Sequence, residues 1–318
     1  MDRLLSSQQL QSLPALGATS RDQISRYLKA LNARNYAPGT LRAIVSVIHR
    51  LLRSLPASRL ACVSQNFAQV TAADIDSLIE VSKTKDLAPS TINNTVNLLR
   101  GFFEFLREAG DMLAQPVIKH RHSVLAPTTL PRPMADADLV PFFNAIDAVR
   151  DRLIFLLMLR CGLRISEVCA LTWQHVDLSQ GTLLILNGKG QVDRTAYLAP
   201  DVEHALKLWQ VQPPQSRYLF PGQHPQIAPL SCKTVSRLMA KYLGQAGITK
   251  PYSPHCLRHT FATQLLNAGV TLEVLKELMG HRSLQMTLCY TQLYESTKRR
   301  QYDQAMAQIE QRQANLGR

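Results

Sequence analysis

The sequence predicts a mainly α-helical protein with two domains and one small antiparallel sheet. Apolar residues recur at three- and four-residue intervals over most of the chain, which is the spacing of one face of an α-helix. A turn signal at Asn187-Gly188 separates two short strand-like stretches and predicts the sheet. Prolines gathered in residues 113–134 interrupt the helical pattern and divide the chain.

The composition is that of a folded protein with an anionic partner. Hydrophobic residues make up 46% and charged residues 19% of the 318 residues, a length that suits two domains. The formal net charge is +13, and basic residues outnumber acidic ones both before and after residue 134. We therefore expect double-stranded DNA as the partner, with an anionic membrane surface as the alternative.

The sequence shows neither a leader pattern nor a membrane segment. The first thirty residues lack a charged-then-apolar signal, and the longest apolar run, residues 153–159, is too short to span a bilayer. The six cysteines include no C-x-x-C pair, so we expect free thiols in a reducing compartment. These features predict a cytoplasmic protein with no membrane partner.

Residues 1–20 form a polar N-terminal extension, and residues 21–112 form a helical domain with an internal echo. Pro38-Gly39-Thr40 opens one amphipathic stretch, and Pro89-Ser90-Thr91 opens another 51 positions later. We expect each proline to stand just ahead of a Ser/Thr helix cap. The matching apolar positions predict two helices in one bundle, and they are Val45, Ile48, Leu52 and Leu55 in the first stretch and Val96, Leu99, Phe103 and Leu106 in the second.

The opposite faces of these two helices are polar and basic. Such a face is either solvated surface or a surface that contacts DNA, and the sequence leaves both interpretations open. The DNA-contact candidates are Arg42 and Arg50 on the first helix and Asn93, Asn97 and Arg100 on the second. Residues 113–134, with the basic run Lys119-His120-Arg121-His122, are expected to form an extended linker that could follow a duplex.

A second domain is predicted from residue 135 onward. Residues 136–146 and 151–159 have helical patterns, and the second is apolar enough to lie inside a core. Gly162 is expected to end that helix, and Ser166 to help start the next one, which places Arg164 at the junction. Taken alone, Arg164 and Glu167 are expected to form an ordinary surface ion pair, and a rigidly held functional arginine is the alternative.

Residues 183–186 and 195–198 are the two predicted strands, joined by Asn187-Gly188-Lys189-Gly190. Lys189 is therefore expected near the hairpin tip, where a lysine is either idle or able to reach a ligand. The segment is not a phosphate-binding P-loop, because the pattern G-x-x-x-x-G-K-[ST] is absent.

Three helices are predicted in the rest of this domain. Residues 231–246 form a helix with a cationic stripe that is a candidate to lie on DNA, at Lys233, Arg237 and Lys241. Residues 256–268 and 272–279 form two more, and Gly280 is expected to end the last one as a C′ glycine. A short helix from Ser283 would carry Tyr290 near its end.

The order of five motifs in this domain resembles the tyrosine recombinase family, the phage-integrase and Xer-type site-specific recombinases. The motifs are Gly-Leu-Arg-Ile-Ser-Glu at 162–167, Gly-Lys-Gly at 188–190, His-Cys-Leu-Arg-His-Thr-Phe-Ala-Thr at 255–263, Leu-Met-Gly-His at 278–281 and Cys-Tyr-Thr at 289–291. The resemblance covers roughly residues 21–295. It implies a SAM-like helical core-binding domain over 21–112 and a mainly helical catalytic domain with a small sheet over 135–295, together closing on duplex DNA.

The resemblance also implies a role for each matching residue. Arg164 and Arg258 would hold the nonbridging oxygens of the scissile phosphate, and Glu167 would support the arginine. His281 would donate to the phosphate. Tyr290 would attack phosphorus and form a 3′-phosphotyrosine.

Two further residues would move protons. His255 would take the phenolic proton, and Lys189 would be the general acid for the departing 5′-oxygen. Because one phosphodiester replaces another, no ATP, metal or other cofactor is implied. His259 is expected to be a structural histidine. The implied activity is site-specific recombination or integration between two synapsed DNA sites.

Residues 296–318 are predicted to be a C-terminal tail with a narrow apolar helical stripe, at Tyr302, Ala305, Met306 and Ile309. Such a stripe needs a cover. Docking on a neighbouring protomer would give a homotetramer on synapsed DNA, with a second recombinase as a further partner. Docking on the same chain is the alternative.

Three other functions fit parts of the pattern. A topoisomerase would form the same 3′-phosphotyrosine without needing a defined site. A zinc enzyme could use His255 and His259, but position 256 is Cys where a zinc-protease helix has Glu. A non-catalytic basic DNA-binding protein would not depend on Tyr290.

Overall fold

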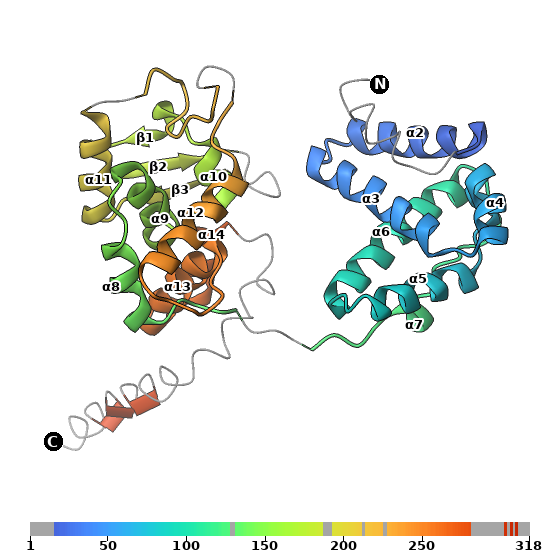
Figure 1. Cartoon of the computed structure of the whole chain (residues 1–318). Coiled ribbons are helices and arrows are strands. Elements are labelled where there is room, and N and C mark those ends of the chain that lie inside the picture. The colour runs from blue at the N-terminus through green and yellow to red at the C-terminus, as the bar shows by residue number, and fades with distance from the viewer. Residues whose placement is uncertain are drawn as a thin grey trace. The chain divides into compact units, whose positions relative to one another are not determined.

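The computed structural model describes residues 16–127, 131–186, 193–211, 214–224, 228–280, 302–303, 306–307 and 309–310. The chain divides into two compact units, Met1–Thr128 and Thr129–Arg318 (Figure 1). Unit 1 has one hydrophobic core, whereas unit 2 has a large core and a smaller one beneath its last helices.

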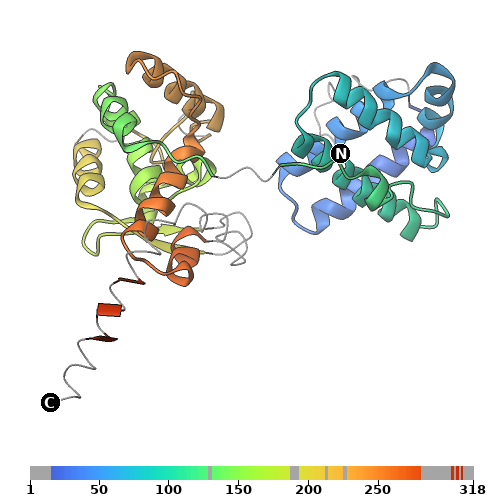
Figure 2. The same ribbon diagram turned by 90° about the horizontal axis from the view of Figure 1, so that it is seen from below.

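Unit 1 consists of helices, seen from two directions in Figure 1 and Figure 2. They are α2 (Ala18–Ala33), α3 (Pro38–Ser54), α4 (Ala57–Gln65), the 3₁₀ turn η1 (Phe67–Gln69), α5 (Ala72–Thr84), α6 (Pro89–Glu108) and the single turn α7 (Lys119–His122). Helix α3 packs against α5 and α6, so the two echoing stretches lie in one bundle as predicted. All eight of the matched apolar side chains are buried.

The start of these two helices differs from the expected one. Pro38 and Pro89 are the first helical residues, and Ala37 and Ala88 are the caps, without any side-chain cap hydrogen bond. Thr40 therefore lies inside the first turn of α3. A proline at this position costs the helix no hydrogen bond, because the first N–H groups of a helix have no intrahelical partner.

The segment expected to be an extended linker is largely part of unit 1. Its basic run forms α7, where Arg121 pairs with Asp76 at 2.5 Å and the His122 side chain is fully buried. Further along, the Val124 backbone exchanges two hydrogen bonds with the Asn93 side chain, at 2.7 and 2.9 Å. Arg121 is thus already occupied by a carboxylate of unit 1.

Unit 2 is mainly helical with a small sheet. Its helices are α8 (Asp136–Asn144), α9 (Val149–Arg160), α10 (Ile165–Ala170), the 3₁₀ turn η2 (Trp173–His175), α11 (Pro200–Gln210), α12 (Cys232–Gln245), α13 (Pro254–Asn267) and α14 (Leu272–Met279). Helix α9 packs against both α11 and α13 (Figure 1), which explains why every residue from 153 to 159 is buried. The apolar run is a core helix, as predicted.

The sheet of unit 2 contains β1 (Val176–Asp177), β2 (Thr182–Ile185) and β3 (Arg194–Tyr197), in that order and antiparallel. The hairpin β2–β3 was predicted, whereas β1 and α11 were not. Ile185 pairs with Arg194, so the connection spans residues 186–193 and is longer than a two-residue turn. Residues 187–192 lie outside the described part of the chain.

The sequence predicts free thiols and no membrane-spanning segment. The five described cysteines are free thiols, and Cys289 lies outside the described residues. No helix among the described residues combines the length and the apolar character needed to cross a membrane.

Candidate active site

A glycine turn brings Arg164 to the start of α10. Helix α9 ends at Arg160, and Gly162 follows with φ +63°, a left-handed conformation that favours glycine. A Cβ at Gly162 would lie 2.5 Å from the ring of Phe261, so a larger residue would also collide with α13. Arg164 is the N-cap of α10, a place that the sequence had suggested for Ser166.

Glu167 anchors Arg164 within the first turn of α10. Its Oε2 accepts a hydrogen bond from the Arg164 backbone N–H at 2.8 Å, and its Oε1 accepts from Arg164 Nη1 at 2.7 Å. The Glu167 side chain is only 4% exposed, and that of Arg164 is 12% exposed. The pair is thus a buried structural element and not a surface ion pair.

Arg258 reaches the same carboxylate from the first half of α13. Its Nη1 lies 3.9 Å from Glu167 Oε2 and also donates to the Gly162 carbonyl, while its Nη2 donates to the Met279 carbonyl at 2.5 Å. Arg164 Nη2 donates to the neighbouring Gly280 carbonyl at 3.3 Å. The two guanidinium groups therefore meet at one place, as the predicted phosphate site requires.

Arg194, at the start of β3, is a third member of this cluster that the sequence analysis missed. Its Nη1 and Nη2 donate to the two oxygens of Glu167, at 3.0 and 2.7 Å, and its Nε donates to the Leu278 carbonyl at 3.0 Å. Burial alternates along β3, with Arg194 and Ala196 on the inward side. An arginine on the inward side of a strand was the signal that could have identified it.

The end of α14 is where these three arginines converge. Consecutive carbonyls of Leu278, Met279 and Gly280 accept from Arg194, Arg258 and Arg164 respectively. Carbonyls at a helix C-terminus lack intrahelical partners and carry the negative end of the helix dipole, so they suit cations. Gly280 has φ +61°, the predicted C′ conformation, and is followed by residue 281.

The electrostatics of the cluster favour an anion. Burial by itself raises the pKa of Glu167, but the hydrogen bonds and charges of Arg194 and Arg164 outweigh it and lower that pKa to about 2. The carboxylate is therefore ionised at any working pH. Three guanidinium groups against this one carboxylate leave a formal excess of 3 − 1 = 2 positive charges. A phosphate diester in its pentacoordinate transition state is an anion of matching charge.

Two histidines of α13 flank the cluster in sequence. His255, in the first turn, is exposed, whereas His259 is half-buried. Burial, and then the charges of His255 and Arg258, lower the pKa of His259 to about 4, so its ring is neutral near pH 7. A neutral, half-buried ring fits a structural histidine. Among the described residues no three His, Cys, Asp or Glu side chains are grouped as a metal site would need.

Lys189, His281 and Tyr290 lie outside the described residues. The chain nevertheless ties the first two to the cluster. Lys189 belongs to the connection between β2 and β3, five residues before Arg194, and His281 is bonded directly to Gly280.

The cationic stripe on α12 lies on an exposed face. Its three side chains have no carboxylate partner among the described residues, and they are Lys233, Arg237 and Lys241. Lys241 Nζ lies 4.6 Å from the centre of the Tyr242 ring, so its stem is partly held against α12.

The DNA-contact candidates of unit 1 fall into two groups. Arg42, Asn97 and Arg100 are exposed on α3 and α6. Arg50, in contrast, donates to Thr95 Oγ1 at 2.7 Å and links α3 to α6, and Asn93 holds Val124. These last two side chains have structural partners within unit 1.

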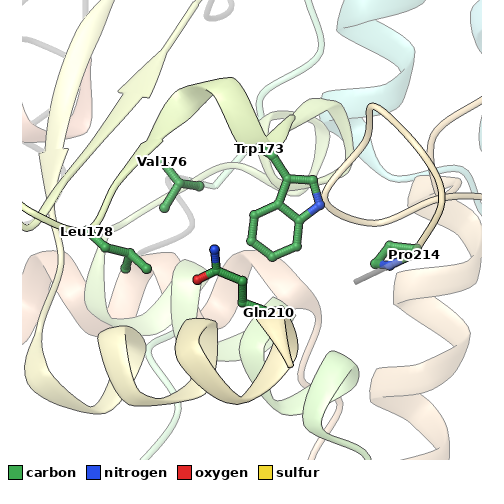
Figure 3. A pocket seen from close by; sticks show the side chains of 5 residues that line it. All are labelled: Trp173, Val176, Leu178, Gln210 and Pro214. Atoms are coloured by element: carbon green, nitrogen blue, oxygen red, sulfur yellow. The ribbon is translucent and has the colours of Figure 1, made fainter. Parts of the chain in front are cut away.

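Figure 3 shows a pocket of unit 2 between η2, β1 and α11. The side chains of Trp173, Val176 and Leu178 line one side, and Gln210 rises from α11 on the other. None of its lining residues carries a charge or belongs to the arginine cluster. The pocket therefore offers no positive charge to a phosphate.

Comparison with known proteins gives two family matches. Residues 134–297 match the Phage integrase family, and residues 24–110 match the Phage integrase N-terminal SAM-like domain. The chain is 34% identical over 229 residues to tyrosine recombinase XerA of Pyrococcus furiosus, covering 70% of this chain and 77% of the relative. It is 30% identical to tyrosine recombinase XerC of Syntrophus aciditrophicus, covering 68% and 73%.

Solved structures share the fold at lower identity. One is the Tn1549 transposon integrase in complex with a circular intermediate DNA, with a TM-score of 0.67 at 21% identity over 84% of this chain and 94% of that one. Another is a lambda integrase tetramer bound to a Holliday junction, with a TM-score of 0.68 at 20% identity over 86% and 77%.

Proposed function

The chain belongs to the phage integrase family of tyrosine recombinases, which break and rejoin DNA strands at specific sites, and we propose that six of its residues carry out that chemistry. The six are Arg164, Lys189, His255, Arg258, His281 and Tyr290. The observation that carries the proposal is the meeting of Arg164 and Arg258 at Glu167 and at the carbonyls that directly precede His281.

In the forward step the Tyr290 oxygen bonds to phosphorus and the bond from phosphorus to the 5′-oxygen breaks. His255 accepts the phenolic proton, and Lys189 gives a proton to the departing 5′-oxygen, so no net proton is consumed. Arg164 and Arg258 stabilise the charge that gathers on the nonbridging oxygens, with His281 as a further donor. Attack by a 5′-hydroxyl from a second site reverses these steps and joins exchanged strands.

We assign residues 21–112, together with the part of 113–134 that belongs to unit 1, to a core-binding domain and residues 135–295 to the catalytic domain. The two family matches and the division of the chain at residue 128 support this assignment. Exposed residues on each unit would contact the duplex, and they are Arg42, Asn97 and Arg100 in unit 1 and Lys233, Arg237 and Lys241 in unit 2. Because the substrate is DNA, we place the protein in the cytoplasm, at the nucleoid when bound.

The active assembly in this proposal is a homotetramer on two synapsed sites, with residues 296–318 docked on a neighbouring protomer. Of this tail the described residues are helical, and Tyr302 and Ile309 are 61% and 45% exposed. A lambda integrase with the same fold forms a tetramer on a Holliday junction. Deletion of residues 300–318 should leave the cleavage of a single DNA site intact and abolish the synapsis of two DNA sites, which native gels measure. Unchanged synapsis would refute the role of the tail.

The test of the chemistry is covalent capture. The protein is incubated with labelled fragments of the DNA flanking its own gene and run on a denaturing gel. We expect a detergent-resistant band in the parent, none in Tyr290→Phe, and an unchanged band in the control Tyr197→Phe, which alters an exposed tyrosine of β3. No band in the parent would refute the proposal. Capture on any supercoiled plasmid, without a defined site, would indicate a topoisomerase instead.

A further inference from the structure

We propose that Arg194 is the positioning residue of the phosphate site: it fixes Glu167 and the end of α14, and through them the places of Arg164 and Arg258. The proposal rests on the proposed function, because it concerns the same site. Arg194 touches no reacting atom in this role. It acts by holding the groups that do.

The geometry leaves the Arg194 side chain no freedom. It starts from β3, where its backbone pairs with Ile185, and its side chain is 5% exposed. Its hydrogen bonds run in two directions, through Nη1 and Nη2 to both oxygens of Glu167 and through Nε to the Leu278 carbonyl. Rotation of the guanidinium plane would break at least one of these contacts, because the donors of arginine have a rigid fork geometry.

Gly280 faces the Arg194 side chain and leaves room for it because glycine has no Cβ. A Cβ at Gly280 would lie 2.9 Å from Arg194 Nη1 and 3.0 Å from its Cδ. Gly280 is thus needed both for its left-handed φ and for the close approach of Arg194. The approach sets where the chain leaves α14, one residue before His281.

Arg194 also determines which guanidinium groups form hydrogen bonds with Glu167. Glu167 has direct hydrogen bonds from Arg194 and Arg164, while Arg258 stays 3.9 Å away and bonds to carbonyls. Without Arg194 the buried carboxylate would lack two of its donors, and Arg258 is the nearest guanidinium that could replace them. A shift of Arg258 toward Glu167 would take it from the position in which it meets a phosphate with Arg164.

Three parts of the proposed machinery are joined through this one side chain. The β2–β3 hairpin carries Lys189 in its connection, α10 carries Arg164, and the end of α14 leads into His281. Arg194 belongs to the first and bonds to the other two. A small displacement at Arg194 therefore changes how β3, α10 and the end of α14 are placed relative to one another.

The test compares DNA binding with the rate of cleavage. Arg194→Lys keeps the charge but loses the forked donors, and Arg194→Met removes both. For each variant we expect a dissociation constant for site DNA within about threefold of the parent. The single-turnover cleavage rate should fall by about 100-fold, the order of loss that follows a displacement of roughly 1 Å. The matched control is Arg160→Lys, because Arg160 is 45% exposed and pairs only with Asp201 among the described residues.

Chemical rescue separates positioning from folding. Millimolar guanidinium chloride should restore at least tenfold of the cleavage rate of Arg194→Ala, whereas sodium chloride at equal ionic strength should not. The same salt should not change Arg160→Ala. Tryptophan emission reports folding of unit 2 in each sample, because both tryptophans, Trp173 and Trp209, lie there. Should Arg194→Ala not fold, Arg194→Lys gives the same comparison.

The outcomes are distinct. Cleavage by Arg194→Lys at the rate of the parent would overturn the inference, because charge alone would then suffice. So would a folded Arg194→Ala whose cleavage guanidinium does not restore. A parent protein that forms no covalent complex with DNA would instead refute the proposed function. Slow but rescuable cleavage with normal DNA binding supports Arg194 as the positioning residue.

Discussion

Replacing Glu167 by Gln tests the arginine cluster as a structural unit. The substitution keeps the shape of the side chain and removes its charge. In the parent, Glu167 accepts two hydrogen bonds from Arg194 and two from Arg164. A glutamine has one acceptor oxygen in place of two, and its NH₂ group would face guanidinium donors. Three buried or nearly buried cations would remain without their counterion.

The size of the effect follows from the pKa of Glu167. That pKa is about 2 in the folded chain against an ordinary value of 4.5, a difference of about 2.5 units. At about 1.4 kcal/mol per unit, ionised Glu167 contributes about 3 kcal/mol to folding. The folded pKa is the lower of the two, so this contribution is complete above pH 4.5 and is lost as the pH falls toward 2. Removal of one partner from a buried ion pair has a cost of similar size, about 3–5 kcal/mol.

Urea unfolding followed by tryptophan emission measures this loss in unit 2 alone, since Trp173 and Trp209 both lie in that unit. At pH 7 we expect Glu167→Gln to lower the free energy of unfolding by about 3 kcal/mol. The difference from the parent should shrink below pH 4.5. A loss under about 1 kcal/mol at pH 7, or a difference that grows on acidification, would refute the reasoning about the cluster.

Three more predictions address the end of α14, the half-buried His259 and the proposed DNA-binding surface. Gly280→Ala should destabilise unit 2 by more than about 1–2 kcal/mol, which is the cost of a left-handed φ alone, because the added Cβ would also collide with Arg194. The control is Gly247→Ala, since Gly247 has a similar φ of +69° but open space around the position of a Cβ. An equal loss of stability in both variants would contradict the close approach of Arg194. The parent should lose stability as the pH falls from 6.5 to about 4, because unfolded His259 gains a proton there and the folded ring, with its pKa of about 4, does not. Urea midpoints at pH 7 and pH 5 measure this loss of stability, and it should be smaller in His259→Gln than in the parent. An equal loss in the two proteins would argue against the contribution of His259. Glutamine in place of the three cations of the α12 stripe, Lys233, Arg237 and Lys241, should weaken the salt dependence of DNA binding. The slope of log binding constant against log salt concentration should fall in magnitude by about 0.9 for each phosphate that the helix no longer neutralises. The control Lys207→Gln on α11 should leave the slope unchanged, and an unchanged slope in the stripe variant would exclude the stripe from the interface.

The sequence predicts what depends on neighbours along the chain. Gly280 follows a helical pattern and ends α14 in the expected conformation, and the run at residues 153–159 is buried as its composition demands. Arg194 could not be assigned in the same way, because its role comes from α10 and α14, which lie 27 and 84 residues away along the chain. The basic run at residues 119–122 was misjudged for the same reason. Its extended form was expected from proline content, but Asp76 and a buried site for His122 hold it against unit 1.

The choice of partners explains how the site can be rigid and still bind an anion. Had carboxylates alone held the arginines, one acid for each would have cancelled the charge that a phosphate needs. Instead Arg194, Arg258 and Arg164 each donate to a peptide carbonyl at the end of α14, which fixes them without a full negative charge. Glu167 supplies the one formal charge, and Arg194, 5% exposed, is placed to neutralise it. Two positive charges, those of Arg164 and Arg258, then remain for the proposed phosphate. The side chain of Arg164, at 12%, is more exposed than those of Arg194 and Arg258, at 5%.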